Sequence, residues 1–192
     1  MFVFVYGSLM SPRSLRTVLP DVLLDACIPA RCSGHRRTFG VAFPNDGSET
    51  DKAYFDASGV RPPIILFCDM PRDQNGWLNG VCVPVDNLGI ASLKRRELRY
   101  DFVEVTDRVA AYDSSRMSAP TFAFIGADRY TAPEDLARGV LPQNYLDTVR
   151  EGATSWESRC PGFLADFDAT TQLPGKPRIA DLRRVDAANG HH

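Results

Sequence analysis

The stretch that decides the fold is FVFVYGSLM, residues 2–10. An unbroken apolar run that ends in glycine and serine is typical of a strand buried on both faces and followed by a turn. Gly7 has no side chain, so the backbone can turn sharply there. Several successive N–H groups after the strand then lack a strand partner, and such a row of donors suits an anion, for example a substrate carboxylate. Taken alone, the pattern indicates only the first strand and turn of a core.

The composition limits the class of protein. The chain has 192 residues, of which 44% are hydrophobic and 24% charged, and this balance predicts one globular domain with a sizeable core. The net charge of −2, without an obvious basic face, argues against a nucleic-acid partner. No apolar run is long enough to cross a membrane, and the N-terminus lacks the pattern of a signal peptide. We therefore expect a cytoplasmic protein without a membrane partner; the sequence does not indicate an oligomeric state.

The cysteines and histidines argue against metal and triad chemistry. An odd number of cysteines without tight pairs predicts free thiols in a reducing compartment. No Cys-x-x-Cys or His-x-x-x-His spacing is present, so we expect neither a metal site nor a cofactor. His35 lies beside Gly34 and Arg36, and we interpret it as a surface histidine. A cysteine-based amide hydrolase would need His35 next to one of the thiols, and the sequence gives this hypothesis little support.

The pattern of elements predicts an α+β fold. Short strands dominate the first two thirds of the chain, and two longer helices are expected, one near residues 87–98 after an Asp86 N-cap and one opened by Pro142. Strands and helices do not alternate regularly, which argues against a doubly wound sheet. We expect a small mixed or antiparallel, barrel-like sheet with the two main helices packed around it. The expected domain covers residues 1–169, and residues 170–192 form a polar C-terminal tail that is expected to be partly disordered.

One carboxylate stands out within the first long helix. Ile90, Leu93 and Glu97 are spaced i, i+3 and i+7, so they share one helix face, and the two apolar members should face the core. Glu97 is then directed inward near the helix C-terminus, where burial and the helix dipole both raise the pKa of a carboxylate. Such a group is suited to proton transfer. A salt bridge to Lys94 or to a distant arginine is the alternative, and helix position alone does not decide between them.

Three motifs then occur in an order that resembles a known family. They are Tyr6-Gly7-Ser8-Leu9 after the first strand, Arg96-Glu97 followed by Tyr100, and Pro142-Gln143-Asn144-Tyr145-Leu146 ahead of Glu151-Gly152-Ala153. Together they resemble the gamma-glutamylcyclotransferase family with its AIG2-like relatives, over roughly residues 2–160. The segment 46–63 and the C-terminal extension are not common features of that family.

The resemblance implies a function and a set of site residues. It implies that backbone N–H groups of Tyr6, Gly7, Ser8 and Leu9 hold a substrate carboxylate and that Glu97 is the general acid/base. Substrate contacts from Tyr100 and Tyr145 are also implied. The implied reaction cyclises a small-molecule gamma-glutamyl amine or peptide to 5-oxoproline and releases the amine without a metal. The competing hypothesis is a non-catalytic module that binds a metabolite or a protein on the same fold. The sequence does not indicate which amine leaves.

Overall fold

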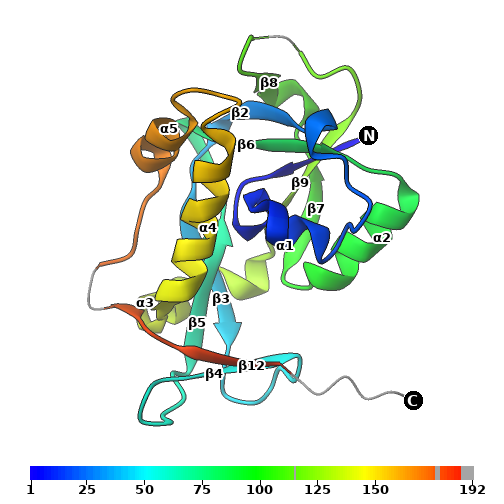
Figure 1. Ribbon diagram of the computed structural model, residues 1–192. Helices are drawn as coiled ribbons and strands as arrows, with labels where there is room; N and C mark the ends of the chain where they lie inside the picture. The colour runs from blue at the N-terminus through cyan, green and yellow to red at the C-terminus, as the bar shows by residue number, and fades with distance from the viewer. Residues whose placement is uncertain (115, 176–177, 187–192) are drawn as a thin grey trace.

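A six-stranded mixed sheet forms the centre of the molecule. The computed structural model describes residues 1–114, 116–175 and 178–186. The strand order is β7-β9-β1-β6-β2-β8, and β1 is antiparallel to β6 but parallel to β9 (Figure 1). In this order the strands are Tyr100–Glu104, Thr121–Gly126, Phe2–Val5, Arg72–Pro84, Ile28–His35 and Val109–Ala111. The predicted α+β class with a mixed sheet is confirmed; β7 and β8 are the edges of this sheet, which is open rather than closed into a barrel.

Strand β1 is covered on both faces, as the apolar run predicted. Val3 and Val5 belong to one hydrophobic cluster, whereas Phe4 and Tyr6 belong to another. Successive side chains of a strand point to opposite faces, so β1 separates two parts of the core. None of the four side chains is more than 6% exposed. The turn that follows β1 is therefore anchored in the interior of the protein.

Helices surround the sheet, and the two longest are the two that the sequence predicted. The α-helices are Pro12–Arg16 (α1), Asn87–Arg96 (α2), Pro133–Arg138 (α3), Gln143–Trp156 (α4) and Phe163–Thr170 (α5). The Asp86 carboxylate accepts a hydrogen bond from the Gly89 N–H at 2.8 Å, which confirms the expected N-cap of α2. Within the described residues, none of the helices combines the length and the apolar character that crossing a membrane would require.

Helix α4 packs directly on the turn after β1. That turn continues into the short 3₁₀ helix Ser8–Met10, and the Trp156 indole N–H donates to the Met10 carbonyl at 2.9 Å. Gly152 lies against the same segment, because a Cβ atom there would come within 2.6 Å of the Ser11 nitrogen. The close approach of a glycine and the indole hydrogen bond together hold the turn in place.

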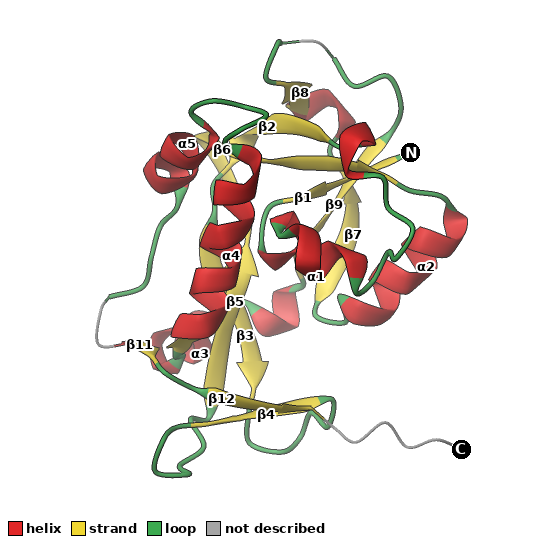
Figure 2. Ribbon diagram, viewed as in Figure 1, coloured by secondary structure: helices red, strands yellow, loops and turns green. Residues whose placement is uncertain are grey.

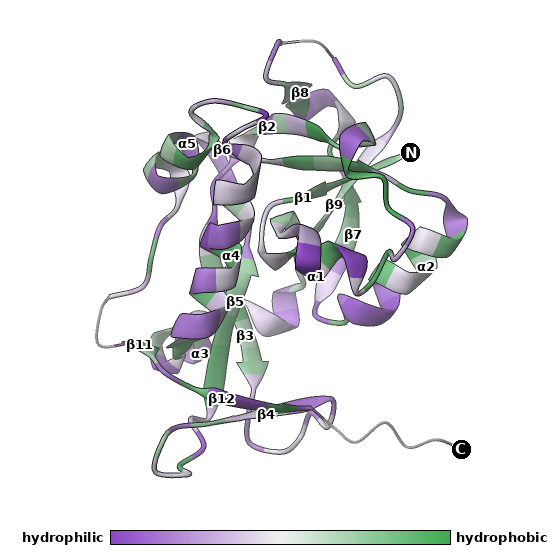
Figure 3. Ribbon diagram, viewed as in Figure 1, coloured by the Kyte–Doolittle hydropathy of each residue, from purple (hydrophilic) through white to green (hydrophobic). Residues whose placement is uncertain are grey.

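A second layer is built on the hairpin of β3 (Thr38–Pro44) and β5 (Ile64–Asp69). Figure 2 shows these strands extending away from the central sheet toward β4 (Lys52–Phe55) and β12 (Arg183–Asp186), which cross the end of the hairpin. β4 and β12 pair antiparallel. Hydrophobic residues concentrate in the central strands and in the hairpin, whereas β12 is mostly hydrophilic (Figure 3).

The C-terminal segment is ordered where it is described. β12 pairs with β4, and β11 (Ile179–Ala180) pairs with β10 (Leu141–Pro142). Backbone pairing with distant strands gives these two strands of the predicted tail a regular structure that a polar composition does not indicate, and the division of the chain at residue 169 stays a prediction. Residues 176–177 and 187–192 of the predicted tail lie outside the described residues.

The thiols agree with the sequence, whereas His35 does not. All five cysteines are free and buried, which confirms the expectation of free thiols. His35 is only 2% exposed, and its Nδ1 lies 2.8 Å from the Met70 carbonyl oxygen, so the prediction of a surface histidine is wrong. β2 pairs with both β6 and β8, which places His35 inside the sheet despite its polar neighbours in the sequence. Burial lowers the pKa of this imidazole.

Candidate active site

A cavity of about 50 Å³ opens where the turn after β1 meets the end of α2. All of the site residues that the sequence indicated line it, namely Tyr6, Gly7, Ser8, Leu9, Glu97, Tyr100 and Tyr145. One water needs roughly 10–15 Å³ of such volume, so a group the size of a carboxylate has room here. The structure therefore brings the turn and the inward-facing glutamate to one place. We call this space the inner cavity.

The turn presents unused backbone donors to the inner cavity. In the described residues, the N–H groups of Gly7, Ser8 and Leu9 donate no backbone hydrogen bond outside the regular elements, and all three residues line the inner cavity. Gly7 lies tightly against the next layer, because a Cβ atom there would be 3.1 Å from the Cys68 Cβ. This contact gives the physical reason for glycine at this position, where even an alanine methyl would be crowded. These donors are the groups that the sequence-based prediction of an anion site invokes, and anion binding by them stays a prediction.

A buried arginine supports the turn from behind. Arg37 is fully buried, and its Nε donates to the Tyr6 carbonyl oxygen at 2.9 Å. Its other nitrogens donate to the Asn79 carbonyl, to the Asn79 side-chain oxygen at 3.0 Å and to the Thr171 hydroxyl at 3.0 Å. All of these acceptors are neutral, and the described residues contain no ion pair of Arg37. Burial lowers the pKa of this guanidinium to about 10, which still leaves it charged at neutral pH. An anion bound at the turn would therefore meet an uncompensated positive charge.

Glu97 caps α2 and faces both the turn and the solvent-side opening. Its backbone N–H donates to the Leu93 carbonyl at 2.8 Å, and its side chain is 17% exposed. Burial raises the pKa of its carboxyl, while the positive charges of Arg96, Lys52 and Arg99 oppose this shift less strongly. A carboxylate with a raised pKa is a stronger base than a solvated one.

Glu97 forms only a long ion pair, and its partner is the neighbouring Arg96. The Arg96 Nε lies 3.5 Å from Glu97 Oε1, which is longer than a good N–H···O hydrogen bond. Another nitrogen of Arg96 donates to the Ser8 hydroxyl at 3.2 Å, so this arginine links the turn to the glutamate. Lys94, the partner considered from sequence, instead lies over the Phe102 ring at 4.7 Å.

The hydroxyl groups of the three tyrosines differ in whether they can still donate a hydrogen bond to a ligand. The Tyr6 hydroxyl donates to the Phe124 carbonyl at 2.5 Å, and the Tyr100 hydroxyl donates to the Cys68 carbonyl at 2.8 Å. The Tyr145 hydroxyl instead accepts from the Cys68 N–H at 3.2 Å. Its own hydrogen has no acceptor in the described part of the chain, so Tyr145 is the tyrosine that can donate to a ligand. Sequence reasoning did not identify Cys68, whose peptide group holds two of these rings.

A larger groove leads outward from the inner cavity, and we call it the outer groove. It has a volume of about 500 Å³ and shares Ser8, Glu97, Tyr100 and Tyr145 with the inner cavity. Its remaining wall is rich in cationic side chains that the sequence analysis did not select, namely Lys52, Arg95, Arg96, Arg99 and Arg184. The unusual length of segment 46–63 was the available signal, because that segment carries Lys52 and the acidic residues that anchor it.

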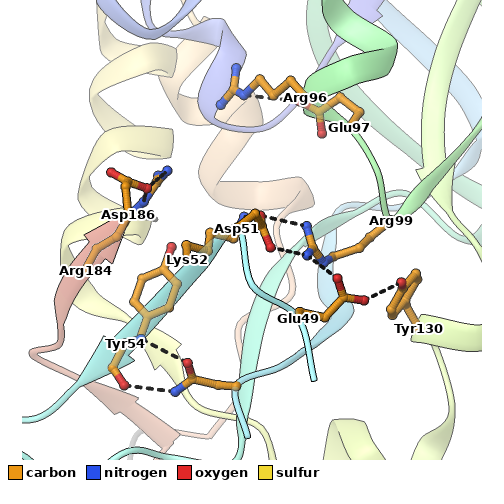
Figure 4. A network of polar contacts seen from close by, with 11 residues as sticks. Glu49, Asp51, Lys52, Tyr54, Arg96, Glu97, Arg99, Tyr130, Arg184 and Asp186 are labelled. Carbon is orange, nitrogen blue, oxygen red and sulfur yellow. Dashed lines mark hydrogen bonds and ion pairs between the residues drawn. The ribbon is translucent and has the colours of Figure 1, made fainter. Parts of the chain in front are cut away.

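An ion-pair network joins that segment to the end of α2 (Figure 4). Arg99 is 3% exposed and donates to Asp51 at 2.6 Å and to Glu49 at 3.0 Å. The Tyr130 hydroxyl donates to the other oxygen of Glu49 at 2.8 Å. Arg99 follows Glu97 by two residues, so the network fixes the position of Lys52 relative to Glu97. We call this set of contacts the Arg99 clasp.

The donor set does not resemble a metal centre. Among the described residues, no group of three or more His, Cys, Asp or Glu side chains is arranged to hold a metal ion. Burial raises the pKa of Cys68, the thiol that lines the inner cavity, to about 12. This thiol is therefore neutral at physiological pH and poorly suited to act as a nucleophile.

No protein-family model and no curated protein sequence matches this chain. Solved structures do match it. A gamma-glutamyl cyclotransferase aligns with a TM-score of 0.61 and 12% identity, covering 93% of this chain and 92% of that one. An uncharacterised human protein aligns with a TM-score of 0.59 and 16% identity over 91% of both chains. A yeast gamma-glutamyl cyclotransferase specific to glutathione aligns with a TM-score of 0.53 and 14% identity, covering 90% of this chain and 97% of that one.

Matches at such low sequence identity establish the fold and not the activity, since one fold can carry different activities. The aligned regions span nearly the whole chain, at 93% for the first of these structures and 90% for the yeast structure. The chain therefore has the gamma-glutamyl cyclotransferase fold.

Proposed function

We propose that this protein is a gamma-glutamylcyclotransferase-like enzyme that converts a gamma-glutamyl amine or peptide to 5-oxoproline. The observation that carries the proposal is the meeting of Glu97 and the turn Tyr6–Leu9 at one cavity. The turn has free N–H donors, and the glutamate has a raised pKa. An anion site beside a single basic carboxylate is what an intramolecular cyclisation requires. The shared fold with gamma-glutamyl cyclotransferases supports the proposal.

Positioning of the substrate accounts for much of the expected rate enhancement. The alpha-carboxylate of the substrate binds the N–H groups of Gly7, Ser8 and Leu9, and the charge of Arg37 favours this binding through the Tyr6–Gly7 peptide. The gamma-glutamyl chain is then held folded, with its alpha-amine close to its own gamma-carbonyl. Intramolecular reactions with such placement gain strongly over the same groups free in water.

Glu97 moves the proton. It takes a proton from the substrate ammonium, and the free alpha-amine attacks the gamma-carbonyl carbon to form the ring C–N bond. The ring nitrogen then loses its second proton, the bond from that carbon to the leaving nitrogen breaks, and Glu97 delivers the two protons in turn to the leaving nitrogen, so that the amine departs as an ammonium. The products are 5-oxoproline and the amine, so atoms and charge balance without an enzyme nucleophile. The Tyr145 hydroxyl, with its free hydrogen, donates to the carbonyl oxygen as negative charge develops there.

Replacement of the proposed base tests this mechanism. Glu97→Gln keeps the size of the side chain and removes its basicity, so we expect kcat for 5-oxoproline release to fall about 100-fold or more. Glu134→Gln changes an exposed glutamate at the start of α3 and should leave the rate unchanged. The substrates are a panel of gamma-glutamyl amino acids, gamma-glutamyl amines and glutathione. An active parent whose Glu97→Gln variant is equally active would refute the role of Glu97.

The non-catalytic alternative makes a different prediction. A binding module on the same fold would bind gamma-glutamyl compounds at the turn without releasing 5-oxoproline. Calorimetric titration of the unmodified protein with the same panel therefore separates the two. Binding together with turnover supports the enzyme, and binding without turnover from any member of the panel supports the module.

A further inference from the structure

The surface that leads outward from Glu97 is strongly cationic in a protein whose net charge is −2. The outer groove continues into a second groove of about 630 Å³ that shares Arg95, Arg96 and Arg184 with it and adds Arg13. The acidic residues along this path are few. Glu97 and Asp51 line the outer groove, where Asp51 is engaged by Arg99, and Glu151 lines the second groove. A local excess of positive charge in two connected grooves attracts anionic ligands.

Lys52 is placed in the outer groove with its charge only partly balanced. Its side chain is 17% exposed, and its Nζ lies over the Phe67 ring at 4.6 Å and over the Phe43 ring at 5.2 Å. The contact from Nζ to Asp51 is long, at 3.7 Å. Both carboxylate oxygens of Asp51 already accept hydrogen bonds from Arg99, at 2.6 and 3.2 Å. Lys52 is therefore a largely buried cation that would gain from an additional anionic partner.

Arg95 of α2 and Arg184 of β12 are two further cationic side chains that line the outer groove. Arg95 bonds to the neutral Ser92 hydroxyl at 3.1 Å, and the described residues contain no carboxylate in an ion pair with it. Arg184 pairs with Asp186, but both side chains are more than half exposed. An exposed pair of this kind has little net stability, so Arg184 can exchange Asp186 for a ligand carboxylate at low cost.

We infer that the outer groove is an anion subsite for the leaving part of the substrate, and that the amine released is an acidic amino acid or peptide that carries two carboxylates. The inference rests on the proposed function, because that function sets the orientation of the substrate. The turn holds the glutamyl end, so the leaving part extends past Glu97 into the outer groove. Lys52 and Arg184 bind the first carboxylate, and the arginines of α2 and α1 bind the second. A neutral leaving part would give none of these cations a further anionic partner.

A series of three substrates tests the charge requirement. Gamma-glutamyl-glutamate, gamma-glutamyl-glutamine and gamma-glutamyl-glutamine amide have nearly the same shape, but their leaving parts carry two, one and no carboxylates. We expect kcat/KM to fall about fivefold with each carboxylate lost, and the differences to shrink in high salt because partly exposed charge pairs are screened. Equal kcat/KM for all three would overturn the inference while leaving the proposed function in place.

Neighbouring arginines on β12 provide a matched pair of variants. Arg184 lines the groove, whereas Arg183 lies over the Phe55 ring at 5.6 Å and does not line it. Arg184→Met and Lys52→Met should each lower kcat/KM for gamma-glutamyl-glutamate about fivefold more than they lower kcat/KM for the neutral amide. Arg183→Met should change neither substrate. An effect of equal size on the neutral amide would contradict charge recognition by the groove.

Binding measurements separate a failure of the subsite from a failure of the reaction. In the Glu97→Gln variant, titration calorimetry should give the same order of affinities, with the dianionic leaving part bound most tightly. If the unmodified protein turns over none of the three compounds but this order holds, the reaction is wrong and the subsite stands. If all three compounds bind equally, or none binds, the subsite is wrong.

Discussion

The inner cavity and the outer groove meet at Glu97, yet they are built from different kinds of residue. The inner cavity is lined by backbone, aromatic rings and a thiol, and the hydroxyls of Tyr6 and Tyr100 already donate to backbone carbonyls. The outer groove is lined by charged side chains, several of them exposed. The inner region is suited to holding one small group in a fixed pose, and the outer region to attracting charge. This division separates chemistry from selectivity in the proposed reaction.

The two regions also differ in how they are held. The turn of the inner cavity is fixed by β1, which is buried on both faces, and by the indole of Trp156 on α4. The position of Lys52 in the outer groove depends on the Arg99 clasp and on the pairing of β4 with β12. Polar contacts near the surface are weaker than packing in a core, so we expect changes in the outer groove to alter selectivity before they alter stability.

The largest expected effect belongs to the buried arginine behind the turn. Arg37→Met removes the guanidinium hydrogen bonds to the Tyr6 carbonyl and to Asn79, and we expect the free energy of unfolding to fall by about 3 kcal/mol or more. The affinity for every gamma-glutamyl compound should fall as well, because the charge that favours the anion is gone. Urea unfolding and calorimetric titration measure the two effects.

The conservative variant separates charge from packing. Arg37→Lys keeps a positive charge near the Tyr6 carbonyl but loses the fork of hydrogen bonds, so it should recover part of the affinity and less of the stability. If Arg37→Met were stable enough to fold and bound gamma-glutamyl compounds as tightly as the parent, the electrostatic role of Arg37 at the turn would be excluded.

A smaller effect is expected when the Arg99 clasp is removed. Arg99→Met leaves Glu49 and Asp51 without their main partner, and we expect a loss of about 1–3 kcal/mol because both carboxylates are partly exposed. KM for anionic leaving groups should rise, since Lys52 loses its fixed position. The exposed pair of Arg150 and Asp168 is the control, and Arg150→Met should cost no more than about 1 kcal/mol.

The clasp hypothesis has a clear contrary outcome. If Arg99→Met changed kcat for a neutral gamma-glutamyl amine as strongly as it changed KM for gamma-glutamyl-glutamate, the clasp would support Glu97 itself rather than the outer groove. Chemical denaturation and steady-state kinetics on the two substrates give the comparison directly.

The smallest expected effect is a pH dependence from Lys52. Burial, together with the charge of Arg99, lowers the pKa of this ammonium to about 8, although Asp51 and Glu97 oppose the shift and Arg184 adds to it. Between this value and the pKa of the unfolded chain, near 10.4, the unfolded state binds more protons, so this lysine makes stability rise with pH there. The affinity for an anion instead falls with pH over this range, because anion binding requires the charged ammonium of Lys52.

Affinity for an anionic leaving group should therefore fall as pH rises through about 8. At pH 9 we expect about a fivefold loss for gamma-glutamyl-glutamate relative to the neutral amide, and this comparison cancels the titration of the substrate amine that both share. The Lys52→Met variant should show no such difference between the two substrates. A parent protein with parallel pH profiles for both substrates would exclude Lys52 as an anion-binding group.

Local patterns in the sequence determined the parts of this protein that depend on neighbouring residues. The apolar run of residues 2–5 predicts a strand buried on both faces, and the helical spacing of Ile90, Leu93 and Glu97 predicts an inward-facing carboxylate. The Asp86 cap follows from the same local rules. Each pattern reports which side of an element is buried, because burial of apolar side chains follows the period of the backbone.

Only the tertiary structure decided which distant residues contact these elements. Lys52 and Arg184 come together because β4 pairs with β12 across more than a hundred residues of sequence, and both strands, at four residues each, are too short to show a period. Arg37 and His35 are polar residues in a polar neighbourhood, yet they are buried, since distant carbonyl groups satisfy their donors. Hydrophobic periodicity encodes burial but not the identity of a distant hydrogen-bond or ion-pair partner. The turn and its glutamate were therefore accessible from the sequence, whereas the cationic groove beside them required the assembled fold.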